Sequence, residues 1–216
     1  MIPWRFKLTS NKYPKTFIPL ETPDDGYPVF IPSIAVMISY ADENGRASIT
    51  PIVSWTVAAR YPFTVTIGLC NGDYSENYFP RHSWKTISRT KEFVLNFPHA
   101  GLCEAVSITG DVSASDPNVD KFALAGLTPG PSKTIQSPII QECPINLECK
   151  VTEIVQAGSH DIFIASVSAI QSDPVLHRDI QDDIMTLDLL RPDPDTGRME
   201  EKRLVWKTLP EFKNLA

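Results

Sequence analysis

The chain has 216 residues, a formal net charge of −6 and a sequence pI of about 5.2. This length is sufficient for one β-rich domain with a substantial core. The acidic balance excludes a broad basic surface of the kind that binds nucleic acid or an anionic membrane. The 19 prolines are more than usual for this length. Because proline is tolerated at strand edges and in loops, the composition favours many short strands over a helix bundle.

The cysteines and the apolar runs indicate neither a metal centre nor a membrane anchor. The cysteines form no pair of Cys-x-x-Cys steps, so we expect no metal site and thiols that are reduced and buried. A redox role for Cys143 and Cys149 is the less favoured alternative. No run is long enough to span a bilayer and no apolar signal core follows Met1, so the predicted location is cytoplasmic. The four cysteines are Cys70, Cys103, Cys143 and Cys149.

Residues 1–32 are rich in proline without helical periodicity, which predicts an extended arm lying on a single domain that covers residues 1–216. Asn44-Gly45 supplies two positive-φ positions for a tight hairpin turn. Pro51 cannot donate to a strand ladder, so its strand is predicted to be a sheet edge that faces a ligand. The β-branched and apolar runs predict three successive strands, at 34–40, 47–58 and 63–69.

The middle of the chain is predicted to hold short helices around one strand. Ser83 stands where an N-cap is expected for a helix over 83–91, and a strand at 93–97 ends at Pro98. Asn118 is the predicted cap of a helix over 118–125 that Gly126 closes, after an earlier helix over 100–108. Prolines at 129, 131, 138 and 144 then exclude regular structure before residue 145.

The longest alternation of apolar and polar residues begins at Ile145. Gly158-Ser159 separates it from a second apolar run that ends near Ile170, which predicts a long β-hairpin. Residues 191–216 are predicted to be a loop and tail with one apolar segment at 204–206. Six or more antiparallel strands with short helices define a mainly β (α+β) fold. Closure into a small barrel would leave no exposed sheet edge.

Two polar clusters are candidates for a binding site, since the common catalytic and phosphate-loop motifs are absent. Ser54 and Thr56 alternate with Trp55, which places two hydroxyls on one face of the strand as a lining for a flat polar ligand. The second cluster lies at a helix start, where free N–H groups and the helix dipole favour an anion. It consists of Arg81, His82, Ser83 and Lys85.

Each cluster also has a purely structural interpretation. Trp55 is more often a core residue than a ligand platform, and hydroxyls are ordinary on a half-exposed strand. A basic segment before a helix is a solvated face at least as often as a phosphate site. Ser88 and Lys91 match an S-x-x-K pattern, but without its companion motifs they are expected on the exposed helix face.

Four runs, in order, resemble the flavin reductase-like family, the FMN-binding split β-barrels that include flavoredoxin-type proteins. They extend over about 29–167, roughly two thirds of the chain. The runs are NGRASITPIVSWTVAARYPFTVTIGL, RHSWKTISRTKEFVLNFP, GDVSASDPNVDKFALAGLTP and SPIIQECPINLECKVTEIVQAGSHDIFIASV. The resemblance implies a Greek-key split barrel with short peripheral helices, a homodimer, and FMN held non-covalently near the subunit interface.

The resemblance also implies site residues. Arg81 and Ser83 are at the positions of the family's phosphate-binding basic and hydroxyl residues, with His82 and Lys85 in the same segment. Asn96 and Pro98 match an N-x-P sequence that lines the ribityl chain, and His160 is expected beside the flavin or the nicotinamide. The stretch expected to contact the isoalloxazine and phosphate is Pro51, Ile52, Val53, Ser54, Trp55 and Thr56.

The favoured function is an NAD(P)H-dependent flavin reductase, in which NADH or NADPH passes hydride from nicotinamide C4 to flavin N5. Such chemistry belongs to the cofactor, which is consistent with a chain that lacks acid–base motifs. One alternative is a flavoredoxin-type electron carrier that acts between a protein donor and a protein acceptor. Another is a non-enzymatic barrel that binds flavin or another small molecule, in which Trp55 and Trp84 are only core residues.

Overall fold

The computed structural model describes residues 34–72, 79–172, 185–188 and 203–206. The predicted arm at 1–32 therefore lies outside the described residues, as does most of the predicted loop at 191–203. The apolar tail segment falls in β11 (Arg203–Trp206), which pairs antiparallel with β10 (Met185–Asp188). Within the described ranges, no helix combines the length and apolarity needed to cross a membrane.

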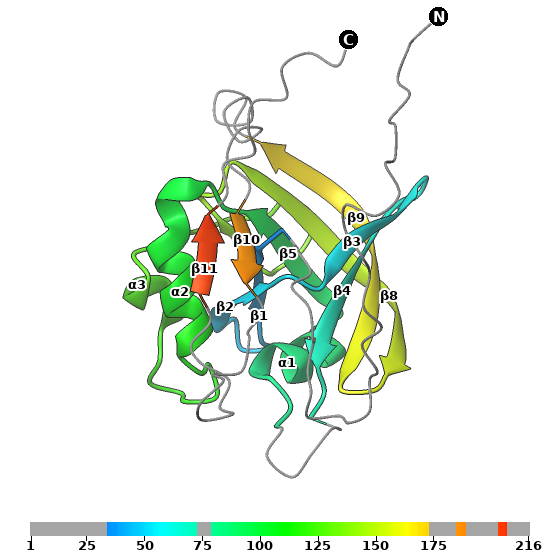
Figure 1. Ribbon diagram of the computed structural model, residues 1–216. Coiled ribbons are helices and arrows are strands. Elements are labelled where there is room, and N and C mark those ends of the chain that lie inside the picture. The colour runs from blue at the N-terminus through cyan, green and yellow to red at the C-terminus, as the bar shows by residue number, and fades with distance from the viewer. Residues whose placement is uncertain (1–33, 73–78, 173–184, 189–202, 207–216) are drawn as a thin grey trace, which may run out of the picture.

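Seven strands form one antiparallel sheet in the order β2-β1-β5-β8-β9-β4-β3 (Figure 1). Some neighbouring strands in the sheet are distant in the chain, such as β1 with β5 and β4 with β9. The predicted mainly β fold with short helices is thus confirmed. The strands are β1 (Val36–Ala41), β2 (Ala47–Ile52), β3 (Trp55–Arg60), β4 (Phe63–Cys70), β5 (Glu92–Phe97), β8 (Ile145–Ala157) and β9 (His160–Ser172).

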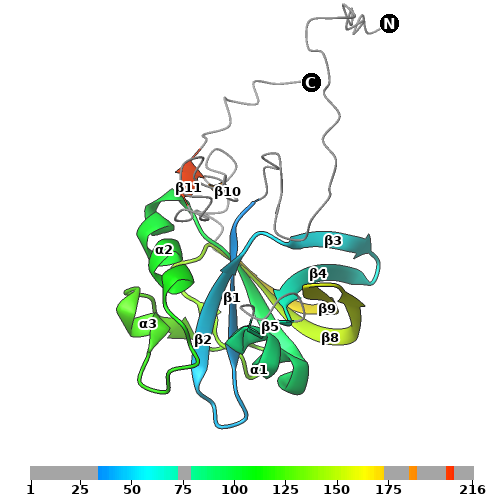
Figure 2. The same cartoon turned by 60° about the horizontal axis from the view of Figure 1, so that its bottom comes forward.

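The two edge strands, β2 and β3, are consecutive in the chain. The single strand predicted over 47–58 is wrong, because the chain bends at Val53 and Ser54 and changes partner from β1 to β4. Ser54 pairs with Gly68 of β4 in both directions, with Gly68 N–H donating to Ser54 O and Ser54 Oγ donating to Gly68 O, each at 2.7 Å. This change of partner joins the two sheet edges, so the sheet curls into a split barrel (Figure 2).

The two predicted hairpins are present, with one turn built differently. Gly158 has φ +76° in the two-residue turn between β8 and β9, as predicted. Between β1 and β2 only Gly45 has a positive φ, so the expectation of two positive-φ residues is wrong. Asp42 accounts for the difference, because its Oδ1 accepts from the N–H groups of Asn44 and Arg46 and closes a three-residue turn.

Alternation along β1 divides the apolar side chains between two cores. Val36, Ile38 and Tyr40 point into the barrel, where they pack with Phe93 and Phe163. Ala35 and Met37 face the other way, toward the helices α2 (Cys103–Asp111) and α3 (Lys121–Leu124). All six residues of β1 are buried, because both faces of the strand are covered. Helix α1 (His82–Thr90) contributes Ile87 to the barrel core.

The helix caps differ from the predicted ones. Helix α1 begins one residue earlier than expected, with Arg81 as its N-cap, so Ser83 lies inside the first turn. Asp120, and not Asn118, caps α3 by accepting from Ala123 N–H at 3.1 Å. Gly126 follows that helix with φ +64°, as the predicted closing residue. A 3₁₀ turn (Ala100–Leu102) precedes α2.

The proline-rich segment between α3 and β8 is more ordered than its composition predicts. The short strands β6 (Pro129–Gly130) and β7 (Ile139–Ile140) pair within it, so the expectation of no regular structure there is wrong. Two carboxylates of the sheet hold it by accepting backbone N–H groups. Glu92 accepts from residues 136 and 137, and Glu148 accepts from residues 133 and 134.

Candidate functional site

A cleft of about 200 Å³ opens where the β2–β3 bend, the end of β4 and the start of α1 meet. The rest of the lining comes from the end of α2, from the residues that follow it and from one residue of α3. The lining residues are Tyr40, Thr50, Pro51, Ile52, Val53, Ser54, Gly68, Leu69, Cys70, Arg81, His82, Ser83, Thr109, Gly110, Val112, Ser113, Ala114, Lys121 and His160.

The first turn of α1 gives the cleft an anion-binding end. Helix α1 has nine residues, and the backbone N–H groups of its first turn have no acceptor within the helix. Arg81 N–H is held by Cys70 O at 3.1 Å, which fixes the helix start against the end of β4. The helix dipole and these N–H groups favour a phosphate or carboxylate.

Ser83 provides an independent sign of a ligand. Its side chain is 1% exposed and lines the cleft, yet its Oγ has no hydrogen-bond partner among the described residues. A buried hydroxyl without a partner costs free energy, so such groups are rare unless something absent from the structure binds them. A phosphate oxygen at the helix start would satisfy Ser83, and the residues present therefore fit a phosphorylated ligand.

Cationic groups lie on both walls. Arg81 stands at the helix start, and Lys121 reaches from α3, where its Nζ donates to Thr109 O at 2.7 Å. Burial, assisted by Arg46, lowers the pKa of His82 below 6.5, and its Nδ1 lies 3.2 Å from the Tyr40 hydroxyl. Burial and then the charge of Arg81 likewise lower the pKa of His160. Both imidazoles are therefore neutral at pH 7 and leave the positive charge to the two longer side chains.

The cleft lining also includes the bend between β2 and β3 that closes the barrel. Ser54 lies against Gly68, and a Cβ added at Gly68 would meet Ser54 Cβ at 3.1 Å, so this contact leaves almost no room for a side chain. Pro51 similarly lies 3.2 Å from the position of a Cβ on Gly110. Residues 51–54 line the cleft beside these close contacts, where they can border a flat ring.

The structure brings together eight of the predicted site residues. They come from three separate segments of the chain, which meet only through the tertiary fold. They are Pro51, Ile52, Val53, Ser54, Arg81, His82, Ser83 and His160.

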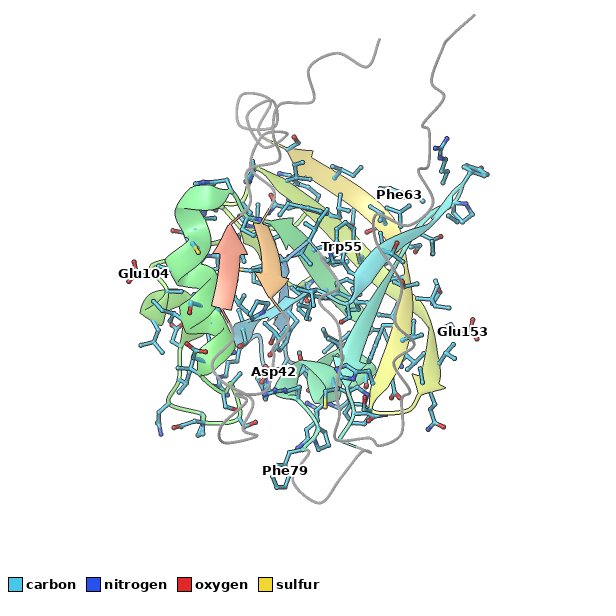
Figure 3. The ribbon with its side chains drawn as sticks, viewed as in Figure 1. Asp42, Trp55, Phe63, Phe79, Glu104 and Glu153 are labelled. Atoms are coloured by element: carbon cyan, nitrogen blue, oxygen red, sulfur yellow. The ribbon has the colours of Figure 1, made fainter. Side chains whose placement is uncertain are left out.

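The other five predicted residues lie outside the cleft lining. Trp55 packs edge-on against Phe97, with ring centroids 5.1 Å apart, and its indole N–H donates to Ile34 O (Figure 3). Thr56 and Lys85 are exposed on β3 and α1, while Pro98 is buried after β5.

Asn96, the remaining predicted residue outside the lining, is fully buried in an amide network. Its Nδ2 donates to Met37 O, and its Oδ1 accepts from Ile140 N–H and from Asn146 Nδ2. The network ties the segment after α3 to the sheet, so in this structure Asn96 has a structural role.

Several lining residues were not predicted from the sequence. Tyr40 and Thr50 reach the cleft from β1 and β2, and the end of α2 with the residues after it contributes Thr109, Gly110, Val112, Ser113 and Ala114. The available signal was the run GDVSASDPNVDKF, which contributes to the family resemblance and includes residues 110–114 and Lys121.

The thiols do not support a redox centre. Burial raises the pKa of Cys143 far above its ordinary value, and burial raises that of Cys149 to about 12. Thiols that stay protonated at neutral pH are poor nucleophiles. No group of three or more metal-ligating side chains occurs in the part of the chain that the structure describes.

Comparison with known sequences places the chain in a family. The profile of the Flavin reductase like domain matches residues 31–183, and the chain therefore belongs to that family. An uncharacterised protein of Aquifex aeolicus is 30% identical over 144 residues, which cover 66% of this chain and 71% of that protein.

Solved structures share the fold at low sequence identity. Nitrilotriacetate monooxygenase component B from Bacillus cereus superposes with a TM-score of 0.72 at 17% identity, covering 95% of this chain and all (100%) of that one. Flavoredoxin from Methanosarcina acetivorans superposes with a TM-score of 0.69 at 19% identity, covering 94% and 96% of the two chains. These likenesses confirm the split-barrel fold.

Proposed function

We propose that this protein is an FMN-dependent oxidoreductase that accepts hydride from NADH or NADPH. The observation that carries the proposal is the unsatisfied Ser83 hydroxyl in the first turn of α1, at a cleft in a flavin reductase-like fold. One phosphate per ligand is what one helix start can hold, and FMN carries one phosphate. The family membership supports the flavin as the rest of the ligand.

The chain's own residues bind and orient the cofactor. Ser83 Oγ and the first-turn N–H groups of α1 hold the phosphate, and Arg81 neutralises its charge. Residues 51–54 would border the isoalloxazine, beside the close contact of Gly68 with Ser54. His160 lines the same cleft with a neutral imidazole ring, and its Nδ1 lies 2.9 Å from Ser159 Oγ.

FMN would supply the hydride-accepting atom, its N5, so no side chain has to act as an acid or a base. The protein's contribution is to keep one face of the ring accessible to the nicotinamide and to exclude water from the other. The lowered pKa values of His82 and His160 are consistent with a positioning role, because neutral rings can pack against an aromatic ligand without a charge.

The experiment is an anaerobic visible spectrum of the purified protein with FMN, before and after NADH and then NADPH are added. Bleaching of the flavin band by either nucleotide, faster than for free FMN, is the expected result. A bound flavin that neither nucleotide bleaches would contradict the reductase and favour an electron carrier between proteins. A protein that retains no FMN after desalting and accelerates no flavin reduction would exclude both.

A further inference from the structure

Asp161, the second residue of β9, is a buried carboxylate that lies next to the cleft residue His160 but outside the cleft lining. It is 5% exposed, and it accepts hydrogen bonds at 2.8 Å on each oxygen, from Asn71 Nδ2 on Oδ1 and from Trp84 Nε1 on Oδ2. Burial of a carboxylate is costly unless such donors compensate for lost water. The two donors come from different segments, one just after β4 and one in α1.

The two residues that donate to Asp161 are each next in the chain to a residue that lines the cleft. Trp84 follows Ser83 in the chain, and the Ser83 hydroxyl is buried without a hydrogen-bond partner among the described residues. Asn71 follows Cys70, whose carbonyl holds Arg81 N–H, and Asn71 also donates to Gly158 O at 2.9 Å in the β8–β9 turn. His160, which lines the cleft, precedes Asp161 directly. The Asp161 carboxylate therefore links the start of β9 to the end of β4 and to the first turn of α1.

We propose that Asp161 is a positioning residue that orients the first turn of α1 for phosphate, and thereby makes the site selective for FMN over riboflavin. The inference rests on the proposed function. With its indole N–H held by Asp161, Trp84 fixes the rotation of α1 about its axis, and that rotation decides where Ser83 Oγ and the first-turn N–H groups point. Loss of the link would leave the ring wall at residues 51–54 intact, because that wall is held by β4.

The test is the Asp161→Asn variant, titrated with FMN and with riboflavin. Both partners of Asp161 are N–H donors, so the amide NH₂ must face one of them and break that hydrogen bond. We expect the affinity for FMN to fall about fivefold or more and that for riboflavin to change less than about twofold. Equal losses for both flavins, or no loss for FMN, would overturn the inference.

Glu148→Gln is the matched control, because Glu148 is also a buried carboxylate that accepts N–H bonds, but its backbone donors belong to residues 133 and 134 and not to the start of α1. Its preference for FMN over riboflavin should equal that of the wild type. A similar fall in that preference would show a general effect of buried charge and would overturn the inference.

Trp84→Phe is the second variant and decides the question if Asp161→Asn does not fold. It keeps an aromatic ring and removes the donor to Asp161 together with part of the indole's packing on the core, and the same selective loss of FMN affinity is expected. An unchanged FMN preference in Trp84→Phe overturns the inference. A wild-type protein that binds neither flavin refutes the proposed function as well, whereas a wild type that prefers FMN and an Asp161→Asn that keeps this preference refute only the role of Asp161.

Discussion

At the scale of single residues, Ser83 and Arg81 carry the assignment of the phosphate site. A hydrogen bond to a charged group contributes about 1.5–3 kcal/mol, so the double variant Arg81→Ala with Ser83→Ala should lose about 3 kcal/mol of FMN binding, or about 100-fold in affinity. Calorimetric or fluorescence titration of the apoprotein measures this.

Lys85→Ala provides the control for this prediction, since Lys85 is exposed on the same helix and lies outside the cleft lining. Its FMN affinity should stay within about twofold of the wild type. If Lys85→Ala weakens FMN binding as much as the double variant does, the phosphate contacts the outer face of α1 and the assignment to Ser83 is incorrect.

The sequence predicts Ser83 at a helix start, and the structure has Ser83 in the first turn of α1, although Arg81 and not Ser83 is the N-cap. The role of Ser83 toward a phosphate stays a prediction. Trp55 illustrates a limit, because alternation along a strand assigns side chains to two faces without saying which face borders the cleft. Asn96 was expected at the ligand from the resemblance alone, and in this structure it lies in the buried amide network. Lys121 was missed, since only tertiary packing of α3 on α2 brings it to the site.

At the scale of elements, Glu148 of β8 anchors the proline-rich segment. Burial alone would raise its pKa, but the N–H groups of Lys133 and Thr134, the Thr134 hydroxyl and Gln171 Nε2 outweigh burial, and the pKa is lowered from 4.5. A lowered folded-state pKa stabilises the folded protein above pH 4.5, and this stabilisation is lost as the pH falls through the folded-state value.

Glu148→Gln should therefore lower the free energy of unfolding by about 2 kcal/mol at pH 7. The difference from the wild type should shrink as the pH falls below 4.5, because the wild-type carboxyl then protonates as well. Urea unfolding at a series of pH values measures both. A difference that stays constant from pH 7 to pH 3 would show that the carboxylate charge does not hold this segment.

The elements were largely predictable because their signals are local. Period-two alternation and Gly158 define the β8–β9 hairpin, and Tyr61 and Pro62 separate β3 from β4, within the gap between the strands predicted over 47–58 and 63–69. The break between β2 and β3 was not predictable, because both halves have β-forming sequences and the bend arises from a change of partner strand. The cap of α3 was misassigned because Asn118 and Asp120 are both good caps.

At the scale of the whole molecule, we propose a homodimer that uses the face of the β8–β9 hairpin near its turn. Val155 and Ile162 are directly opposite in the register and are 39% and 37% exposed, so they form a paired apolar surface. Light scattering should give about twice the chain mass of 24.1 kDa.

Ile162→Asp should shift the protein to a monomer, because a carboxylate in an apolar interface is left without a partner. Ile170→Asp is the control, being an exposed residue toward the other end of the same strand. A wild type with the mass of one chain would contradict the dimer. A mass that Ile162→Asp leaves unchanged would place the interface elsewhere.

The most direct measurement is a crystal structure of the protein with FMN bound. We expect a phosphate oxygen within hydrogen-bond distance of Ser83 Oγ and of the first-turn N–H groups of α1, and the isoalloxazine against residues 51–54. A phosphate bound instead by Lys121 and the segment from Thr109 to Ala114, with Ser83 still unpartnered, would contradict it.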